Sequence, residues 1–231
     1  MGNMNNNLTE LAFILDRSGS MAPVTEAAIT GFNDFLREQQ SVEGQARLTL
    51  VLFDDEYLVP LDGIPVSEAV PLDTRTYVPR GSTALLDAIG TTVDRLGERL
   101  AALPEEQRPG SVIVAILTDG YENASQNFTW NDISRRIREQ TDVYKWQFLF
   151  LGAGRDAIAT AAQLSIAAVN ASQFASDTSG TRSSQRAMSR KMSAMRKKSA
   201  GRLMTAQDQA DAEAPLSNLV AEEDASDRRG K

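Results

Sequence analysis

Two unbroken apolar runs constrain the fold of this 231-residue chain more than any other feature of its sequence. Residues 11–15 and 112–117 contain no polar side chain, and a polar turn follows each run directly. Such runs are typical of strands in a parallel sheet, because helices bury both faces of that sheet. Residues 47–53 and 146–151 are further strand candidates. The sequence therefore predicts a buried, mainly parallel sheet.

Segments with helical periodicity separate these strands. Apolar side chains recur at spacings of three and four residues over 29–36 and again over 85–100, which predicts helices packed on the sheet. A short strand at 57–61 follows the second strand after a three-residue turn, so the two strands must be antiparallel. Pro60 places this short strand at an edge. The pattern predicts an α/β fold: a doubly wound, Rossmann-like, mainly parallel six-stranded sheet with one antiparallel edge strand and helices on both faces.

The loop after the first apolar run carries three oxygen ligands. Asp16 ends the run, Ser18 and Ser20 follow at alternate positions, and Gly19 permits a tight turn. Carboxylate and hydroxyl oxygens suit a small, hard cation. Open α/β sheets also bind their ligands at the carboxyl ends of the strands. The sequence therefore predicts a Mg²⁺ site in this loop, with Mn²⁺ or Ca²⁺ as alternatives.

The spacing Asp16-x-Ser18-x-Ser20, together with two distant residues, resembles the metal-ion-dependent adhesion site (MIDAS) of von Willebrand factor A-type (VWA) domains. The distant residues are Thr83, at the start of the second predicted helix, and Asp119, which follows the second apolar run. The three pieces occur in the family's order. The resemblance covers roughly residues 8–171 of this sequence.

This resemblance implies a metal held by Asp16, Ser18, Ser20 and Thr83, directly or through water, with Asp119 acting directly or through a bridging water. It also implies that the first strand lies in the middle of the sheet, which brings the three metal loops to one rim. In the family, an Asp or Glu of a partner protein fills an open position on the metal. We therefore expect a metal-dependent protein-binding adaptor or scaffold, and no enzyme.

Three local features have alternative interpretations. Thr83 alone would be interpreted as a helix N-cap, but beside the other two loops metal ligation is favoured. The acidic turn 54–56 could hold Ca²⁺, but it lacks the spacing of a calcium loop, so a solvated hairpin is expected. Residues 152–157 match the dinucleotide fingerprint G-x-G-x-x-A. The next predicted strand, a weak one at 167–169, ends near Asn170 and not at an acidic residue, so a tight turn before a helix is favoured.

The chain contains neither Cys nor His, which excludes disulfides, zinc–thiolate sites and Ser-His-Asp hydrolysis. Mg²⁺-dependent phosphoryl transfer through Asp16 is an alternative function, although such enzymes usually need an acid where this chain has Ser18. The N-terminus lacks the regions of a signal peptide, and no apolar stretch reaches the roughly 20 residues of a membrane span. We therefore expect a cytoplasmic protein, similar to intracellular bacterial members of the family and of bacterial or phage origin.

The last quarter of the chain differs in composition. We divide the chain into a VWA-like domain over 1–171 and a C-terminal extension over 172–231. The net charge of the whole chain is −7, yet the extension holds 11 basic and 8 acidic residues. The acidic body argues against general nucleic-acid binding, which is expected only through the basic segment 182–202.

This extension is expected to be helical or disordered. Basic residues and three methionines at helical spacing predict an amphipathic helix over 182–204. Such a helix could bind an acidic partner, nucleic acid or an anionic membrane, and this association is a further alternative function. We favour a helix packed on the acidic body, or a disordered segment. Residues 205–231 are acidic and rich in Ala and Ser, and we expect them to be disordered.

Overall fold

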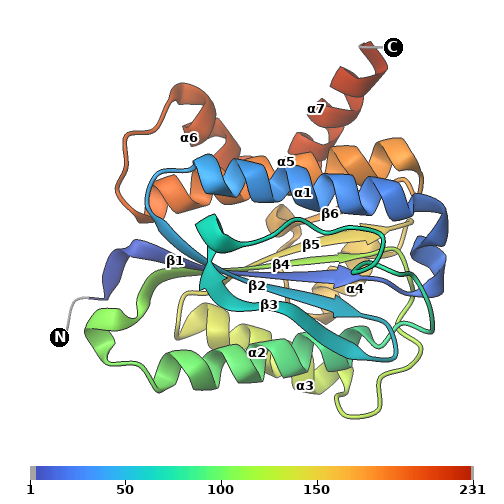
Figure 1. The fold of residues 1–231 in the computed structure, drawn as a ribbon, viewed down its shortest axis with the longest axis horizontal. Helices are drawn as coiled ribbons and strands as arrows, with labels where there is room; N and C mark the ends of the chain where they lie inside the picture. Colours follow the sequence, from blue (N-terminus) through green and yellow to red (C-terminus); the bar gives the residue numbers. More distant parts are fainter. Residues whose placement is uncertain (1–3, 230–231) are drawn as a thin grey trace.

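The computed structural model describes residues 4–229 and contains one six-stranded sheet in the order β3-β2-β1-β4-β5-β6 (Figure 1). Every neighbouring pair is parallel except β2 and β3, so the antiparallel strand lies at an edge. The predicted doubly wound α/β fold is confirmed. The strands are β1 (Asn5–Asp16), β2 (Gln45–Phe53), β3 (Tyr57–Pro65), β4 (Pro109–Thr118), β5 (Gln147–Ala153) and β6 (Ala171–Phe174).

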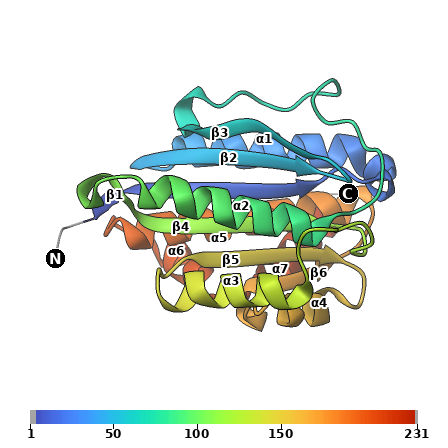
Figure 2. The same ribbon diagram turned by 90° about the horizontal axis from the view of Figure 1, so that it is seen from below.

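Helices cover both faces of the sheet, as Figures 1 and 2 show. Alternate residues of β1 supply the two cores: Phe13 and Leu15 pack in one apolar cluster, and Ala12 and Ile14 in the other. The first cluster includes α1 (Thr25–Ser41) and α5 (Thr178–Ser199). The second includes α2 (Leu85–Ala101), α3 (Trp130–Asp142) and α4 (Ala157–Gln163). The unbroken apolar runs are explained, because each central strand faces helices on both sides.

The last strand crosses the boundary that we expected between the domain and its extension. Sequence analysis predicted a weak strand at 167–169, but the chain forms a 3₁₀ turn there, Ala168–Asn170, and then pairs with β5 as β6. The sheet therefore reaches Phe174 and not 171. The segment that follows continues directly into α5.

The helix predicted over 182–204 is present as α5, and it packs on the protein itself. Met188 and Met192 are fully buried in the core cluster that includes α1. Ser189 and Ser193 donate hydrogen bonds to the Glu38 carboxylate at 2.6 and 2.7 Å. These two buried hydroxyls therefore have hydrogen-bond partners. None of the helices in residues 4–229 combines the length and the apolar character that a membrane span requires.

Two helices occupy the segment that sequence analysis expected to be disordered. These are α6 (Ala206–Glu213) and α7 (Leu216–Arg229), and both pack against α5. A capping box between Thr205 and Asp208 begins α6, and α7 buries Leu216, Leu219 and Val220. Three apolar residues in a charged segment gave too weak a pattern to predict this packing.

The basic block of α5 is largely neutralised by these acidic helices. Arg186 pairs with Glu223 and Asp227 at 2.9 and 2.6 Å. Arg190 pairs with Asp211 and Glu223, both at 2.7 Å. The charge pattern of the extension is therefore complementary within the extension itself.

If α5 belongs to the same cooperative unit as the sheet, Met192→Ala is expected to lower the free energy of unfolding by about 2–4 kcal/mol, because the substitution leaves a cavity in the core. Urea denaturation followed by circular dichroism measures this change. Leu203→Ala is the matched control: Leu203 is 98% exposed, so a change within about 0.5 kcal/mol is expected. Equal stability of both variants would show that α5 is not part of the cooperative core.

Candidate metal centre

The three predicted metal loops meet at the carboxyl ends of the central strands. Strand β1 lies between β2 and β4 and is parallel to both, so the chain leaves β1 in one direction and returns on its other side. Such a reversal of strand order is where open α/β sheets form their ligand sites. Asp16 ends β1, and Asp119 directly follows β4. The topology alone therefore brings these two carboxylates close together.

The Asp16 carboxylate is fully buried and held by hydrogen bonds. Its Oδ1 accepts from the Ser18 backbone N–H at 2.6 Å, and its Oδ2 accepts from the Thr118 hydroxyl at 2.5 Å. Burial raises the pKa of Asp16, and the nearby Asp119 raises it further, while the hydrogen bonds from Ser18 and Thr118 lower it. A cation beside this carboxylate would compensate for the cost of burying its charge.

The hydroxyls of the first loop connect Asp16 to Asp119. Ser18 Oγ and Ser20 Oγ lie 3.0 Å apart, and Ser20 Oγ donates to Asp119 Oδ1 at 2.5 Å. Neighbouring ligand oxygens of an octahedral Mg²⁺ ion, with bonds of about 2.1 Å, are about 3 Å apart. The Ser18–Ser20 distance therefore fits a small divalent cation, and the shorter Ser20–Asp119 distance is a hydrogen bond between two candidate ligands.

Thr83 lies at the start of α2 but does not cap it. The N-cap residue is Ala84, and within residues 4–229 the Thr83 hydroxyl makes no hydrogen bond. Its backbone is fixed instead, because the Thr83 N–H donates to Asn123 Oδ1 at 2.9 Å and the Asn123 N–H donates to the Thr83 carbonyl at 3.0 Å. Thr83 Oγ1 lies 2.5 Å from the position that a Cβ atom on Gly120 would occupy. The hydroxyl is therefore beside Asp119 and available as a ligand.

All five residues predicted from the sequence thus come to one rim of the sheet: Asp16, Ser18, Ser20, Thr83 and Asp119. The donor set is two carboxylates and three hydroxyls, all hard oxygen ligands. Within the described part of the chain, no three Asp, Glu, His or Cys residues gather into a metal-binding group. Any ion held here would therefore depend on the hydroxyls.

Sequence analysis missed the residue that joins two of these loops. Asp54 is fully buried, and its Oδ2 lies 3.0 Å from an Arg17 guanidinium nitrogen and 3.3 Å from Arg80 Nε. The Asp54 carbonyl also accepts from the Ala84 N–H at 2.9 Å. The hairpin was expected to be solvated, which holds for Asp55 but not for Asp54. No local pattern could have revealed this, because the partners of Asp54 come from other loops.

Three further contacts fix the site and were not foreseen. Tyr77 is fully buried and donates to the Asp16 carbonyl at 2.6 Å. The Gly19 N–H donates to the Gly81 carbonyl at 3.2 Å, which ties the first loop to the second. Ser176, between β6 and α5, donates to Asp119 Oδ2 at 3.2 Å. The segment after residue 171 therefore reaches the rim of the metal centre.

The residues that match a dinucleotide fingerprint form a tight turn. β5 ends at Ala153, Gly154 adopts a φ of +83°, and the short helix α4 begins at Ala157. A positive φ of this size favours glycine. The interpretation as a turn before a helix is confirmed.

The fold and the rim define the class of this protein. It is a doubly wound α/β domain with polar loops at the point where the strand order reverses. No family profile matches the sequence, and no curated protein matches it. Solved structures do match. Proximal thread matrix protein 1 from the mussel byssus, with a zinc-occupied MIDAS motif, aligns with a TM-score of 0.54 and 14% identity over 77% of this chain and 46% of that chain.

Two other similar structures extend the comparison. A mutant of the PilB minor pilin from Streptococcus sanguinis aligns with a TM-score of 0.51 and 11% identity, over 83% of this chain and 62% of that chain. A von Willebrand factor type A protein from Catenulispora acidiphila aligns with a TM-score of 0.49 and 18% identity, over 78% and 41%. The chain spans about half the length of the structures that it matches. The chain has the fold of a von Willebrand factor A-type domain, as its sequence indicated.

Gly120→Ala is expected to weaken Mn²⁺ binding by about tenfold, because the new Cβ would displace the Thr83 hydroxyl. Isothermal titration calorimetry measures the affinity. Gly97→Ala is the control, since the nearest atom to a Cβ at Gly97 lies 4.0 Å away and alanine favours helix α2 by about 0.5–1 kcal/mol. Unchanged affinity in both variants would remove Thr83 from the site.

Asp54→Asn is also expected to weaken Mn²⁺ binding by about tenfold, because the charge that holds Arg17 and Arg80 between the loops is lost. Glu10→Gln provides the comparison. Glu10 is 1% exposed and pairs with Arg99 at 2.8 Å, but it lies in the middle of β1, away from the carboxyl end that carries Asp16. Calorimetry should show that Glu10→Gln binds Mn²⁺ with the parent affinity, even if the substitution lowers the stability of the protein. Equal losses of affinity in the two variants would mean that the effect is only a loss of folded protein.

Proposed function

We propose that this chain is a divalent-metal-dependent protein-binding module, acting as an adaptor or scaffold. The observation that carries this proposal is the convergence of side-chain oxygens from three loops at one rim, with Ser20 Oγ 3.0 Å from Ser18 Oγ and 2.5 Å from Asp119 Oδ1. This arrangement supports a metal centre at the place where open α/β sheets bind ligands. Protein binding is the use that we infer for it.

In this proposal Asp16, Ser18, Ser20 and Thr83 hold the ion directly or through water, and Asp119 does so directly or through a bridging water. The ion would supply Lewis acidity and a position that an Asp or Glu of a partner protein fills. Mg²⁺ is the ion we propose, with Mn²⁺ or Ca²⁺ as alternatives. The zinc-occupied MIDAS motif of the mussel protein supports a divalent cation in a similar fold.

The charges around the site support metal dependence. Arg17 and Arg80 are the cations of the first two loops, and both are paired with acidic residues of the β2–β3 hairpin. Arg17 lies 3.0 Å from Asp54, and Arg80 lies 2.8 Å from Glu56. Their charge is therefore already compensated. The attraction for a partner carboxylate would come from the bound ion, so removal of the ion should abolish binding.

The alternative functions have less support from the geometry. Phosphoryl transfer through Asp16 would need a proton donor where Ser18 stands, and the Asp16 carboxylate is held by Ser18 and Thr118 in a fully buried position. Association of nucleic acid or membrane with the basic helix would have to displace α6 and α7, which pair with Arg186 and Arg190. We therefore infer that the function resides at the rim that carries the candidate metal ligands. The location that we propose is cytoplasmic.

Capture of a partner from lysate of the native host tests the proposal. A partner is expected with the parent protein in Mg²⁺ and to be lost in EDTA and with Asp16→Ala. Thr83→Ser keeps the hydroxyl and should retain the partner, whereas Thr83→Val keeps the shape, lacks the hydroxyl and should lose it.

Circular dichroism of each variant must show an intact fold before loss of the partner is interpreted. A partner that remains in EDTA and with Thr83→Val would place the binding surface elsewhere. Loss with Thr83→Ser together with retention by Thr83→Val would indicate a need for the threonine methyl group and not for its oxygen.

A further inference from the structure

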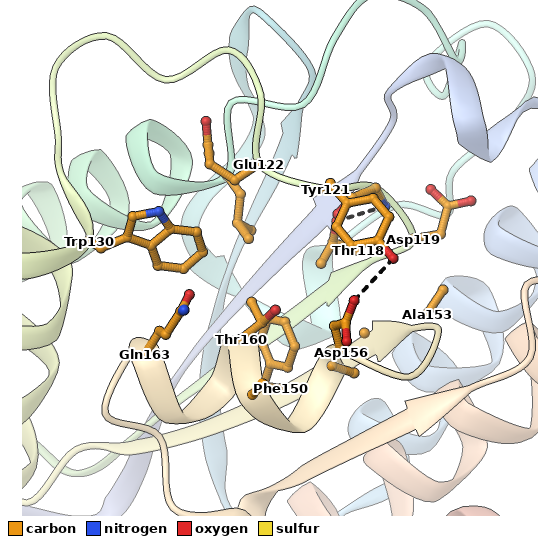
Figure 3. Close-up of a pocket in the computed structure, with 15 residues that line it drawn as sticks. Thr118, Asp119, Tyr121, Glu122, Trp130, Phe150, Ala153, Asp156, Thr160 and Gln163 are labelled. Carbon is orange, nitrogen blue, oxygen red and sulfur yellow. Dashed lines mark hydrogen bonds between the residues drawn. The ribbon is translucent and has the colours of Figure 1, made fainter.

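A cavity of about 330 Å³ opens beside the metal centre and shares Thr118 and Asp119 with it (Figure 3). It lies between the carboxyl ends of β4 and β5, under the loop that carries Tyr121 and beside α4. Figure 3 shows the Tyr121 hydroxyl next to the Asp156 carboxylate on one side of it. A partner bound at the metal would therefore meet this cavity next.

Three aromatic side chains line the cavity, and they differ in their exposure to solvent. Tyr121 is 70% exposed, Trp130 is half-buried and Phe150 is buried. Exposed aromatic side chains beside a binding site are typical of residues that contribute strongly to protein interfaces. Their flat faces can also pack against the aliphatic part of a long side chain.

One carboxylate at the cavity is free to pair with a ligand. Asp156 is exposed, and although it is the N-cap residue of α4, its side chain makes no capping hydrogen bond. Its contact is the Tyr121 hydroxyl, which lies 3.4 Å from Asp156 Oδ2. Glu122 differs, because its carboxylate accepts the backbone N–H groups of Leu86, Ala124 and Ser125 at 2.8–3.1 Å. Among the described residues that line the cavity, none is a lysine or an arginine.

We propose that this cavity receives a lysine or arginine side chain of the same partner that offers a carboxylate to the metal, an inference that rests on the proposed function. The aliphatic stem packs on Trp130 and Phe150, and the cationic head meets Asp156 and the face of Tyr121. An apolar side chain would leave the Asp156 carboxylate without a partner, and an acidic one would be repelled by it.

Asp119, which the cavity shares with the metal centre, limits the distance between the partner's carboxylate and its basic side chain. Because Asp119 belongs to both the metal centre and the cavity, the carboxylate and the cation come from neighbouring positions of the partner. The partner motif is therefore an Asp or Glu with a Lys or Arg close to it in the partner's surface. The same arrangement gives the partner one negative and one positive contact, which fixes its orientation on the rim.

Selection from a library of short random-sequence peptides tests this inference. The immobilised protein is loaded with Mn²⁺, and the bound peptides are released with EDTA, so that metal-dependent binders are collected. The expected result is an enrichment of Asp or Glu with Lys or Arg one to three positions away. Peptides selected on Asp156→Asn should still contain Asp or Glu but should show no enrichment of Lys or Arg. This variant should bind the peptides selected on the parent protein roughly three- to tenfold more weakly.

Glu106→Gln is the matched control, because Glu106 is an exposed carboxylate in the turn Glu105–Gln107 before β4, away from the candidate metal centre, and its removal changes the net charge equally. The selected peptides should bind this variant with the parent affinity. Metal-dependent peptides without a basic residue, or an equal loss with Glu106→Gln, would overturn the inference and leave the proposed function intact. If Mn²⁺ binds but EDTA releases no peptide, the proposed function fails and the inference fails with it.

Discussion

The parallel pairing of β1 on both sides is the constraint on which the rest of this structure depends. Asp16 is in register with Phe53 of β2, and Leu15 is in register with Leu117 of β4, so three strands end at one level. The loops that follow must then share one rim. Hydrogen bonds at the ends of the strands, such as the one from the Arg17 N–H to the Phe53 carbonyl at 2.8 Å, then fix the loops relative to one another. Strand register therefore places Asp16 and Asp119 at the candidate metal centre, and the long segment between β3 and α2 brings Thr83 to the same rim.

The strands and the polar residues that meet at the rim were predictable because their signals are local. Unbroken apolar runs indicated buried strands, and Asp16, Ser18 and Ser20 lie within one short loop. Asp54 and Tyr77 were not predictable, because their role depends on buried contacts with residues distant in the sequence. The helix α7 was missed for a related reason: Leu216, Leu219 and Val220 are a weak pattern until α5 provides a surface to cover.

The last sixty residues show how polar residues can be accommodated in a core. α5 buries serines and methionines on one side and carries arginines on the other. Ser189 and Ser193 are satisfied by Glu38, and Arg186 and Arg190 by carboxylates of α6 and α7. Burying a charged helix without such partners would be costly. The extension therefore forms an outer layer of the fold. Its amphipathic helix α5 packs against the apolar core on one side and against the acidic helices α6 and α7 on the other.

The meeting of three separate loops at one rim has a consequence for how such chains diverge. The site uses a few short stretches at the ends of strands, and the helices between them only have to return the chain to the correct end of the sheet. Their sequences can drift, lengthen or be exchanged without moving a ligand. A mussel structural protein and this chain can thus share an architecture at 14% identity. Changes in the helices are therefore compatible with an unchanged rim, whereas a change in strand order would separate its oxygens.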